Sequence, residues 1–81
     1  MGYLRPFEVI AELNSKYGVE IKSTQALNIL LSKMGIIEKN YGYWNLTDLG
    51  KKYSIFEYAI RQDCWRPEIV RAVAEYLMHK K

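Results

Sequence analysis

The chain has 81 residues, of which 49% are hydrophobic and 14% aromatic, and its net charge is +3 at pH 7. A chain of this length forms one domain, because chains divide only at several times this size, so we assign residues 1–81 to a single domain. The hydrophobic content excludes a disordered protein. No strictly apolar run is longer than Ile29–Leu31, and this excludes a membrane span, which needs roughly 20 apolar residues.

The N-terminal region lacks the pattern of a secretory signal peptide, because Arg5 and Glu8 interrupt any apolar stretch. Cys64 is the only cysteine, so no internal disulfide can form, which fits a reducing compartment. We therefore expect a cytoplasmic protein that does not associate with membranes.

Catalysis has little support in the sequence. The only histidine, His79, stands close to the end of the chain, and Cys64 has no histidine nearby to act as its base. No Cys/His cluster has metal-ligand spacing, and no glycine-rich phosphate loop is present. We expect no enzymatic activity, no metal and no cofactor.

The first predicted helix spans residues 6–17. Pro6 is favoured at the first helical position and Gly18 at the left-handed end of a helix. The alternation in residues 19–22 then predicts a short strand.

A second helix is predicted over residues 24–34, with Ser23 or Thr24 as its N-cap and Gly35 after its end. Its apolar stripe consists of Leu27, Leu30, Leu31 and Met34. The opposite stripe is polar and consists of Gln25, Asn28 and Ser32, with Ile29 exposed among them.

Residues 36–47 predict a β-hairpin, in which Gly42 supplies the positive φ of a tight turn. Alternation places Trp44 in the core. A short helical turn over residues 48–53 should follow, capped by Thr47. Residues 55–64 are compatible with a strand or with a helix.

Pro67 then opens a final helix that ends near His79, whose apolar face contains Ile69, Val73, Tyr76 and Leu77. This face either closes the core or joins a second copy in a homodimer, and we favour core packing. The order of elements predicts an α+β, mainly α fold: a winged helix-turn-helix with a short β-hairpin wing and a closing C-terminal helix.

The second helix and the hairpin are the candidate binding elements. Side-chain amides on a recognition helix can bond an adenine edge with two hydrogen bonds, and a wing can lie along the phosphate backbone. The residues that we predict to contact DNA are Lys22, Thr24, Gln25, Asn28, Ser32, Lys33, Lys39, Asn40 and Tyr41. The alternative is that this helix face and turn are simply solvated.

Residues 24–53 resemble the C-terminal winged-helix region of phage antirepressor-type proteins. That family has a helix with LN-x-LL followed by glycine, an apolar-charged strand, and then W-x-LT-x-x-G-K-x-Y. The matching residues are Leu27, Asn28, Leu30, Leu31, Gly35, residues 36–39, Trp44, Leu46, Thr47, Gly50, Lys51 and Tyr53. The segment LRPFEVIAEL is similar to the family's first helix, and Trp65 with Ile69 and Val70 is similar to its closing tryptophan and helix.

The family's module normally follows an N-terminal domain, and its segment between Tyr53 and Trp65 is longer than the one here. The resemblance implies a phage or mobile-element protein that binds DNA or antagonises a regulator. We expect a sequence-specific regulator that binds double-stranded DNA, with helix 24–34 in the major groove and hairpin 36–47 as the wing.

The alternative is a winged helix used for protein–protein contact, such as a phage-encoded modulator of a host protein. Residues 1–50 carry five basic and five acidic side chains, whereas duplex DNA binders usually concentrate basic residues on one face. That neutrality, the exposed Ile29 and the seven tyrosines favour a protein partner.

Overall fold

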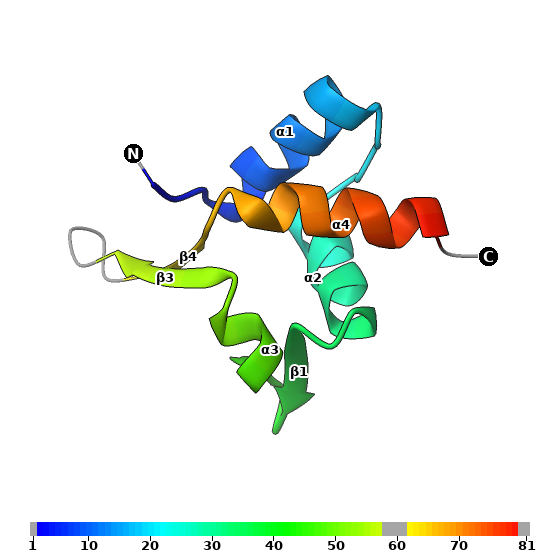
Figure 1. Ribbon diagram of the computed structural model, residues 1–81. Helices are drawn as coiled ribbons and strands as arrows, with labels where there is room; N and C mark the ends of the chain where they lie inside the picture. Colours follow the sequence, from blue (N-terminus) through cyan, green and yellow to red (C-terminus); the bar gives the residue numbers. More distant parts are fainter. Residues whose placement is uncertain (1, 58–61, 80–81) are drawn as a thin grey trace.

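The computed structural model describes residues 2–57 and 62–79 and shows a small, mainly helical α+β domain (Figure 1). Its elements are α1 (Pro6–Tyr17), α2 (Thr24–Lys33), β1 (Ile37–Asn40), β2 (Tyr43–Leu46), α3 (Asp48–Lys51), β3 (Ser54–Glu57), β4 (Gln62–Trp65) and α4 (Glu68–His79). The strands form two separate antiparallel hairpins, β1–β2 and β3–β4. No helix in the described ranges is long and apolar enough to cross a membrane.

Local capping chemistry fixes the ends of α1 and α2. Gly18 adopts the left-handed conformation, with φ of 67°, and the predicted bounds of α1 are confirmed. Ser23, rather than Thr24, caps α2, because its hydroxyl oxygen accepts a hydrogen bond of 3.1 Å from the Ala26 backbone N–H. The helix ends at Lys33, one residue earlier than predicted.

The predicted strand at residues 19–22 is wrong. This connection is irregular, and the Val19 backbone N–H donates to the Leu13 carbonyl oxygen at 3.1 Å instead of to a strand. Val19 and Ile21 alternate with exposed residues because both are half-buried against the core, whereas Glu20 and Lys22 face solvent. Periodicity of two is therefore present without a partner strand.

The first hairpin has the predicted position and a tight two-residue turn. Ile37 pairs with Leu46 and Lys39 pairs with Trp44 across the strands. Both turn residues have positive φ, 53° at Tyr41 and 83° at Gly42, as a type I′ turn requires.

The second hairpin resolves the ambiguous segment in favour of strands. Ser54 pairs with Trp65 and Ile55 with Cys64, while residues 58–61 of the ambiguous segment lie outside the described residues. Trp65 also bridges to Leu4, with backbone hydrogen bonds of 2.6 and 2.7 Å, which attaches the N-terminal segment to this hairpin.

One core lies between the three longer helices and the starts of the hairpins. α1 packs on both α2 and α4, and the fully buried side chains include Leu13, Leu27, Leu31, Ile69 and Val73. The predicted core role of the final helix is confirmed, although α4 begins at Glu68 rather than Pro67. Its use in a homodimer stays a prediction.

A close junction between α3 and residues 35–36, directly before β1, fixes the base of the first hairpin. The Thr47 hydroxyl accepts a hydrogen bond of 3.0 Å from the Gly50 N–H and lies 2.5 Å from the Gly35 carbonyl oxygen, to which it donates. Gly50 is buried, and a Cβ atom there would lie 1.9 Å from the Ile36 carbonyl oxygen. Only glycine permits this approach of the two backbones. Helix α3 ends at Lys51, so it is two residues shorter than the helical turn predicted over residues 48–53.

Candidate functional site

The nine residues predicted to contact DNA lie on α2, on the connection before it and on the β1–β2 hairpin, and α2 contacts β1 directly. Seven of them are exposed, whereas Asn28 and Ser32 are half-buried. The exposed ones are Lys22, Thr24, Gln25, Lys33, Lys39, Asn40 and Tyr41. Of the predicted polar stripe of α2, only Gln25 is therefore fully exposed, whereas Asn28 and Ser32 are half-buried.

Ser32 already uses its hydroxyl within the helix. Its Oγ donates to the Ile29 carbonyl oxygen at 2.7 Å, so in this conformation the proton is not available to a phosphate. Thr24 makes no such bond among the described residues, because Ser23 supplies the cap. Of the two hydroxyls, Thr24 is therefore better placed to donate to a ligand.

Asn28 and Gln25, the predicted pair of base-reading amides, have different surroundings. Asn28 faces a groove of about 290 Å³ between α2 and the first hairpin, whereas Gln25 is exposed outside it. The groove is lined by Pro6, Asn28, Ile37, Trp44, Asn45, Leu46 and Trp65. Within the part of the chain that the structure describes, the Asn28 amide makes no hydrogen bond, so it is available to a ligand.

The prediction that Trp44 belongs to the core is wrong, because its side chain is 36% exposed. Alternation gives the correct side of the strand, since Trp44 shares a hairpin face with the buried Ile37 and the half-buried Leu46. The hairpin extends past the core, so its residues near the turn are not covered by other elements. Lys39, directly opposite in register, places its Nζ 5.4 Å from the centre of the Trp44 ring, a cation–π contact.

Trp44 borders the candidate site but was not among the residues predicted to contact DNA. The cross-strand pairing with Lys39 is the signal that would have found it, because a two-residue turn at residues 41–42 fixes that register.

The hairpin tip holds an aromatic residue in an unfavourable backbone conformation. Tyr41 has a φ of 53°, a region that bulky side chains rarely occupy, and its side chain is 99% exposed. Packing within the domain therefore does not compensate for the strain. Such outliers concentrate where a residue serves a ligand.

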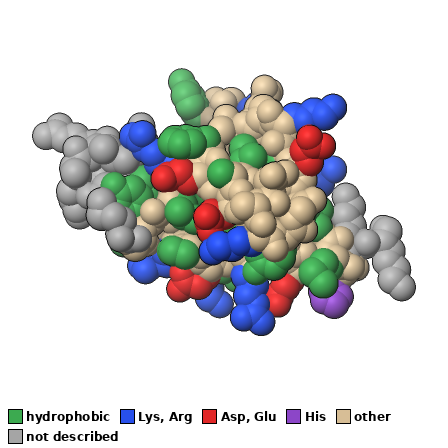
Figure 2. Space-filling model, turned by 90° about the horizontal axis from the view of Figure 1, so that it is seen from above, with side chains coloured by type: hydrophobic (Ala, Val, Ile, Leu, Met, Phe, Trp, Pro, Cys, Tyr) green, Lys and Arg blue, Asp and Glu red, His purple; other side chains and the backbone are tan. Residues whose placement is uncertain are grey.

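The charges on the described surface divide into paired and unpaired groups. Ion pairs join Lys16 to Glu12 at 2.7 Å, Lys51 to Asp48 at 3.9 Å, and Arg71 to Glu75 at 3.1 Å. The hydrogen bond from Lys16 to Glu12, with the attraction between their charges, raises the pKa of Lys16. On the face over α1 and α4, acidic and basic side chains are interspersed (Figure 2).

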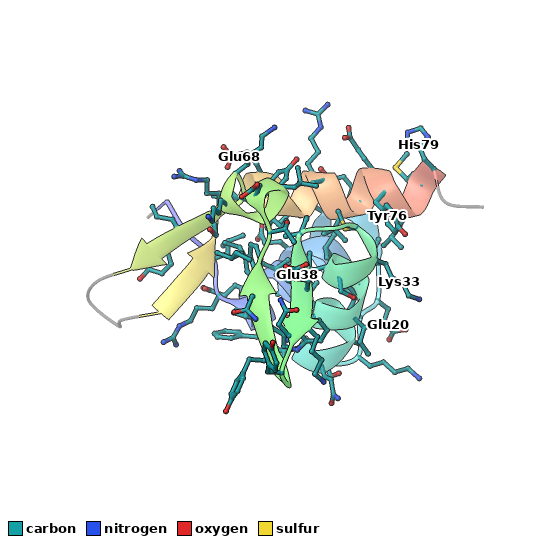
Figure 3. The ribbon with its side chains drawn as sticks, turned by 90° about the horizontal axis from the view of Figure 1, so that it is seen from below. Glu20, Lys33, Glu38, Glu68, Tyr76 and His79 are labelled. Atoms are coloured by element: carbon teal, nitrogen blue, oxygen red, sulfur yellow. The ribbon has the colours of Figure 1, made fainter. Side chains whose placement is uncertain are left out.

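The lysines of the candidate site differ from these. Among the described residues, Lys22, Lys33 and Lys39 take part in no ion pair. Acidic residues are still present in the same region, since Glu20 and Glu38 are exposed there (Figure 3). Glu38 nevertheless lies on the hairpin face opposite to Lys39, because neighbouring strand residues alternate.

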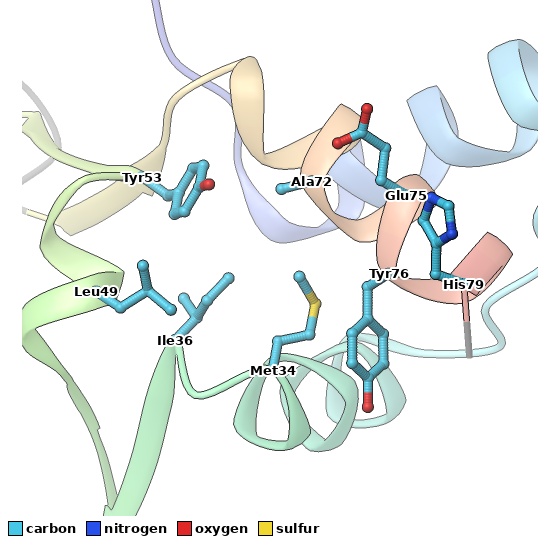
Figure 4. Close-up of a pocket in the computed structure, with 8 residues that line it drawn as sticks. All are labelled: Met34, Ile36, Leu49, Tyr53, Ala72, Glu75, Tyr76 and His79. Atoms are coloured by element: carbon cyan, nitrogen blue, oxygen red, sulfur yellow. The ribbon is translucent and has the colours of Figure 1, made fainter. Parts of the chain in front are cut away.

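A second groove, of about 390 Å³, lies between α4, α3 and the end of α2 (Figure 4). It is lined by Met34, Ile36, Leu49, Tyr53, Ala72, Glu75, Tyr76 and His79. No residue of the predicted site lines it. Residues 2–57 and 62–79 contain no group of three or more His, Cys, Asp or Glu side chains placed to hold a metal ion.

Comparison of the chain with protein-family models, with curated proteins and with solved structures finds no match.

Proposed function

We propose that this chain is a winged-helix domain that binds double-stranded DNA, with α2 as the recognition helix and β1–β2 as the wing. The order of elements supports this, since two helices joined by the short connection 18–23 are followed at once by a hairpin. The observation that carries the proposal is the set of unpaired lysines around this surface. Lys22, Lys33 and Lys39 have no acidic partner among the described residues, whereas Lys16 on α1 and Lys51 on α3 do. Lys52, directly after α3, is also unpaired but stands apart from the other three in sequence, so the proposal depends on the grouping of three unpaired lysines on α2, its preceding connection and the wing.

In the proposed complex, α2 enters the major groove. Thr24 and Gln25 stand in its first turn, from which a recognition helix contacts base edges. Lys22 precedes the helix and Lys33 ends it, so both reach phosphates beside the groove. Lys39 and the hairpin tip lie along the backbone. The resemblance to phage antirepressor-type proteins supports a regulator encoded by a phage or another mobile element.

The test measures affinity for a pool of labelled random duplexes by fluorescence anisotropy at 50 and 200 mM salt. If the three lysines neutralise three phosphates, the logarithm of the binding constant falls with a slope of about −2.7 against the logarithm of salt concentration. The fourfold rise in salt then weakens binding roughly 40-fold. Absence of binding at 50 mM salt would overturn the proposal.

Single-lysine variants identify the surface. Lys39→Ala should weaken binding to all sequences and reduce the slope by about 1. Lys16→Ala is the matched control, because Lys16 is paired with Glu12 on α1, outside the proposed interface. Equal effects of the two substitutions would indicate general charge attraction rather than this interface.

The second candidate function is protein–protein contact through the same surface. Ile29 is 46% exposed in the middle of α2 and Tyr43 is 74% exposed on the hairpin, and such side chains are typical of protein interfaces. Ile29→Ser separates the two functions. It should reduce the affinity of a protein partner strongly, and it should leave the salt slope of DNA binding unchanged.

A further inference from the structure

We infer that the groove between α2 and the first hairpin binds one unpaired nucleobase of a DNA strand. The base stacks on Trp44, is recognised by Asn28, and has its phosphate beside Lys39. This inference rests on the proposed function and extends it, because fully paired duplex DNA presents no free base to such a groove.

The hairpin supplies an aromatic wall and a cation together. Trp44 remains 36% exposed although it lies on the core-facing side of its strand, so its ring borders the groove rather than filling the core. Stacking of a base on an aromatic side chain stabilises single-stranded complexes whatever the base. The Lys39 ammonium does not itself line the groove, but it lies 5.4 Å from the centre of the Trp44 ring and so places positive charge beside this wall.

The opposite wall supplies hydrogen bonds. The Asn28 amide lines the groove and has no partner among the described residues, so it offers both a donor and an acceptor to the edge of a base. Asn45 also borders the groove, but it stands on the same strand as Trp44, on the hairpin face of Tyr43, and its amide nitrogen donates to the Tyr43 carbonyl oxygen at 3.1 Å. The Asn28 amide is therefore the group that can discriminate between bases.

The size and floor of the groove fit one planar ring system. Its volume of about 290 Å³ is close to the lower end of the range for small-molecule sites and suits one planar ring system. Its floor is apolar, formed by Ile37, Leu46 and Trp65. Charge decides the occupant: Lys39 has no acidic partner, which favours a ring carried by a phosphate chain over an aromatic side chain of a protein.

The experiment compares two labelled duplexes of one sequence, one fully paired and one with a single extra unpaired thymine. The wild-type chain should bind the second probe about 5-fold or more tightly, since one stacked base contributes roughly 5- to 150-fold in affinity. Trp44→Ala should abolish this preference. Tyr43→Ala is the matched control, because it removes an exposed aromatic ring from the other face of the same strand.

A variant on a different element keeps the test independent of hairpin folding. Asn28→Ser removes an amide that makes no hydrogen bond within the described chain, so the fold should persist while the preference for the unpaired thymine falls several-fold. Thermal unfolding of each variant checks that it is folded.

The outcomes are distinguishable. Equal binding of both probes by the wild type overturns the groove inference and leaves DNA binding by α2 intact. A preference that survives Trp44→Ala, or one that Tyr43→Ala abolishes as well, also overturns it. Failure of the wild type to bind either probe overturns both the inference and the proposed function.

Discussion

Substitution of Gly50 by alanine tests the junction that holds the first hairpin against α3. The added Cβ atom would lie 1.9 Å from the Ile36 carbonyl oxygen and 3.2 Å from a methyl carbon of Leu46. The close neighbour is a backbone atom that also accepts a hydrogen bond of 3.1 Å from the Thr47 N–H, so it cannot turn aside. The two backbones must therefore separate by about 1 Å to restore an acceptable contact.

Two opposing effects set the magnitude. Overpacking of this kind costs about 1 to 3 kcal/mol, and the upper part of the range applies because backbone rather than side chain must move. Alanine is a better helix former than glycine by about 1 kcal/mol, which offsets part of the cost. We expect a net loss of about 2 kcal/mol, which in a domain of this size lowers Tm by about 8 to 16 °C.

Thermal unfolding followed by far-ultraviolet circular dichroism measures the change. Gly2→Ala is the control, because a Cβ atom at Gly2 meets nothing within 4 Å. We expect its Tm to remain close to that of the wild type. If Gly50→Ala left Tm unchanged or raised it, the close contact between α3 and Ile36 would not exist as described.

Three further predictions concern a cap, two indoles and an ion pair. Ser23→Ala should lower the free energy of unfolding by about 1 kcal/mol in urea denaturation, whereas Ser23→Asn, which keeps a capping oxygen, should not. Trp44 is 36% exposed and Trp65 is 8% exposed. Acrylamide should therefore quench the fluorescence of Trp44, measured in a Trp65→Phe variant, more strongly than that of Trp65, measured in a Trp44→Phe variant. Equal quenching would contradict these exposures. Glu12 raises the pKa of Lys16, so their pairing stabilises the fold below the ordinary lysine pKa, and this contribution is lost as pH rises through the raised value. In an NMR titration, the pKa of Lys16 should be lower in the Glu12→Gln variant than in the wild type.

The helices could be predicted from the sequence because their boundaries are local. Pro6 and Gly18 delimit α1 through their own backbone preferences, and Ser23 caps α2 through a bond only three residues long. The turn at residues 41–42 follows from Gly42 in the same way. None of these features requires knowledge of distant parts of the chain.

The features that sequence analysis missed depend on distant parts of the chain. Whether residues 19–22 form a strand depends on a partner strand, which alternation does not reveal. The exposure of Trp44 depends on how far the hairpin extends past the core, and periodicity gives only the side of the strand. The orientation of Asn28 toward a groove arises only when α2 and the hairpin are packed together.

The turn residue Tyr41 has a consequence for engineering this domain. In a type I′ turn, asparagine before glycine is strongly preferred, so Tyr41→Asn relaxes the backbone without removing any packing. Directed evolution for thermal tolerance, or sequence design on this backbone alone, would therefore replace Tyr41 early. A library screened without ligand would select the more stable turn and discard the aromatic tip, so selection at this position must include binding.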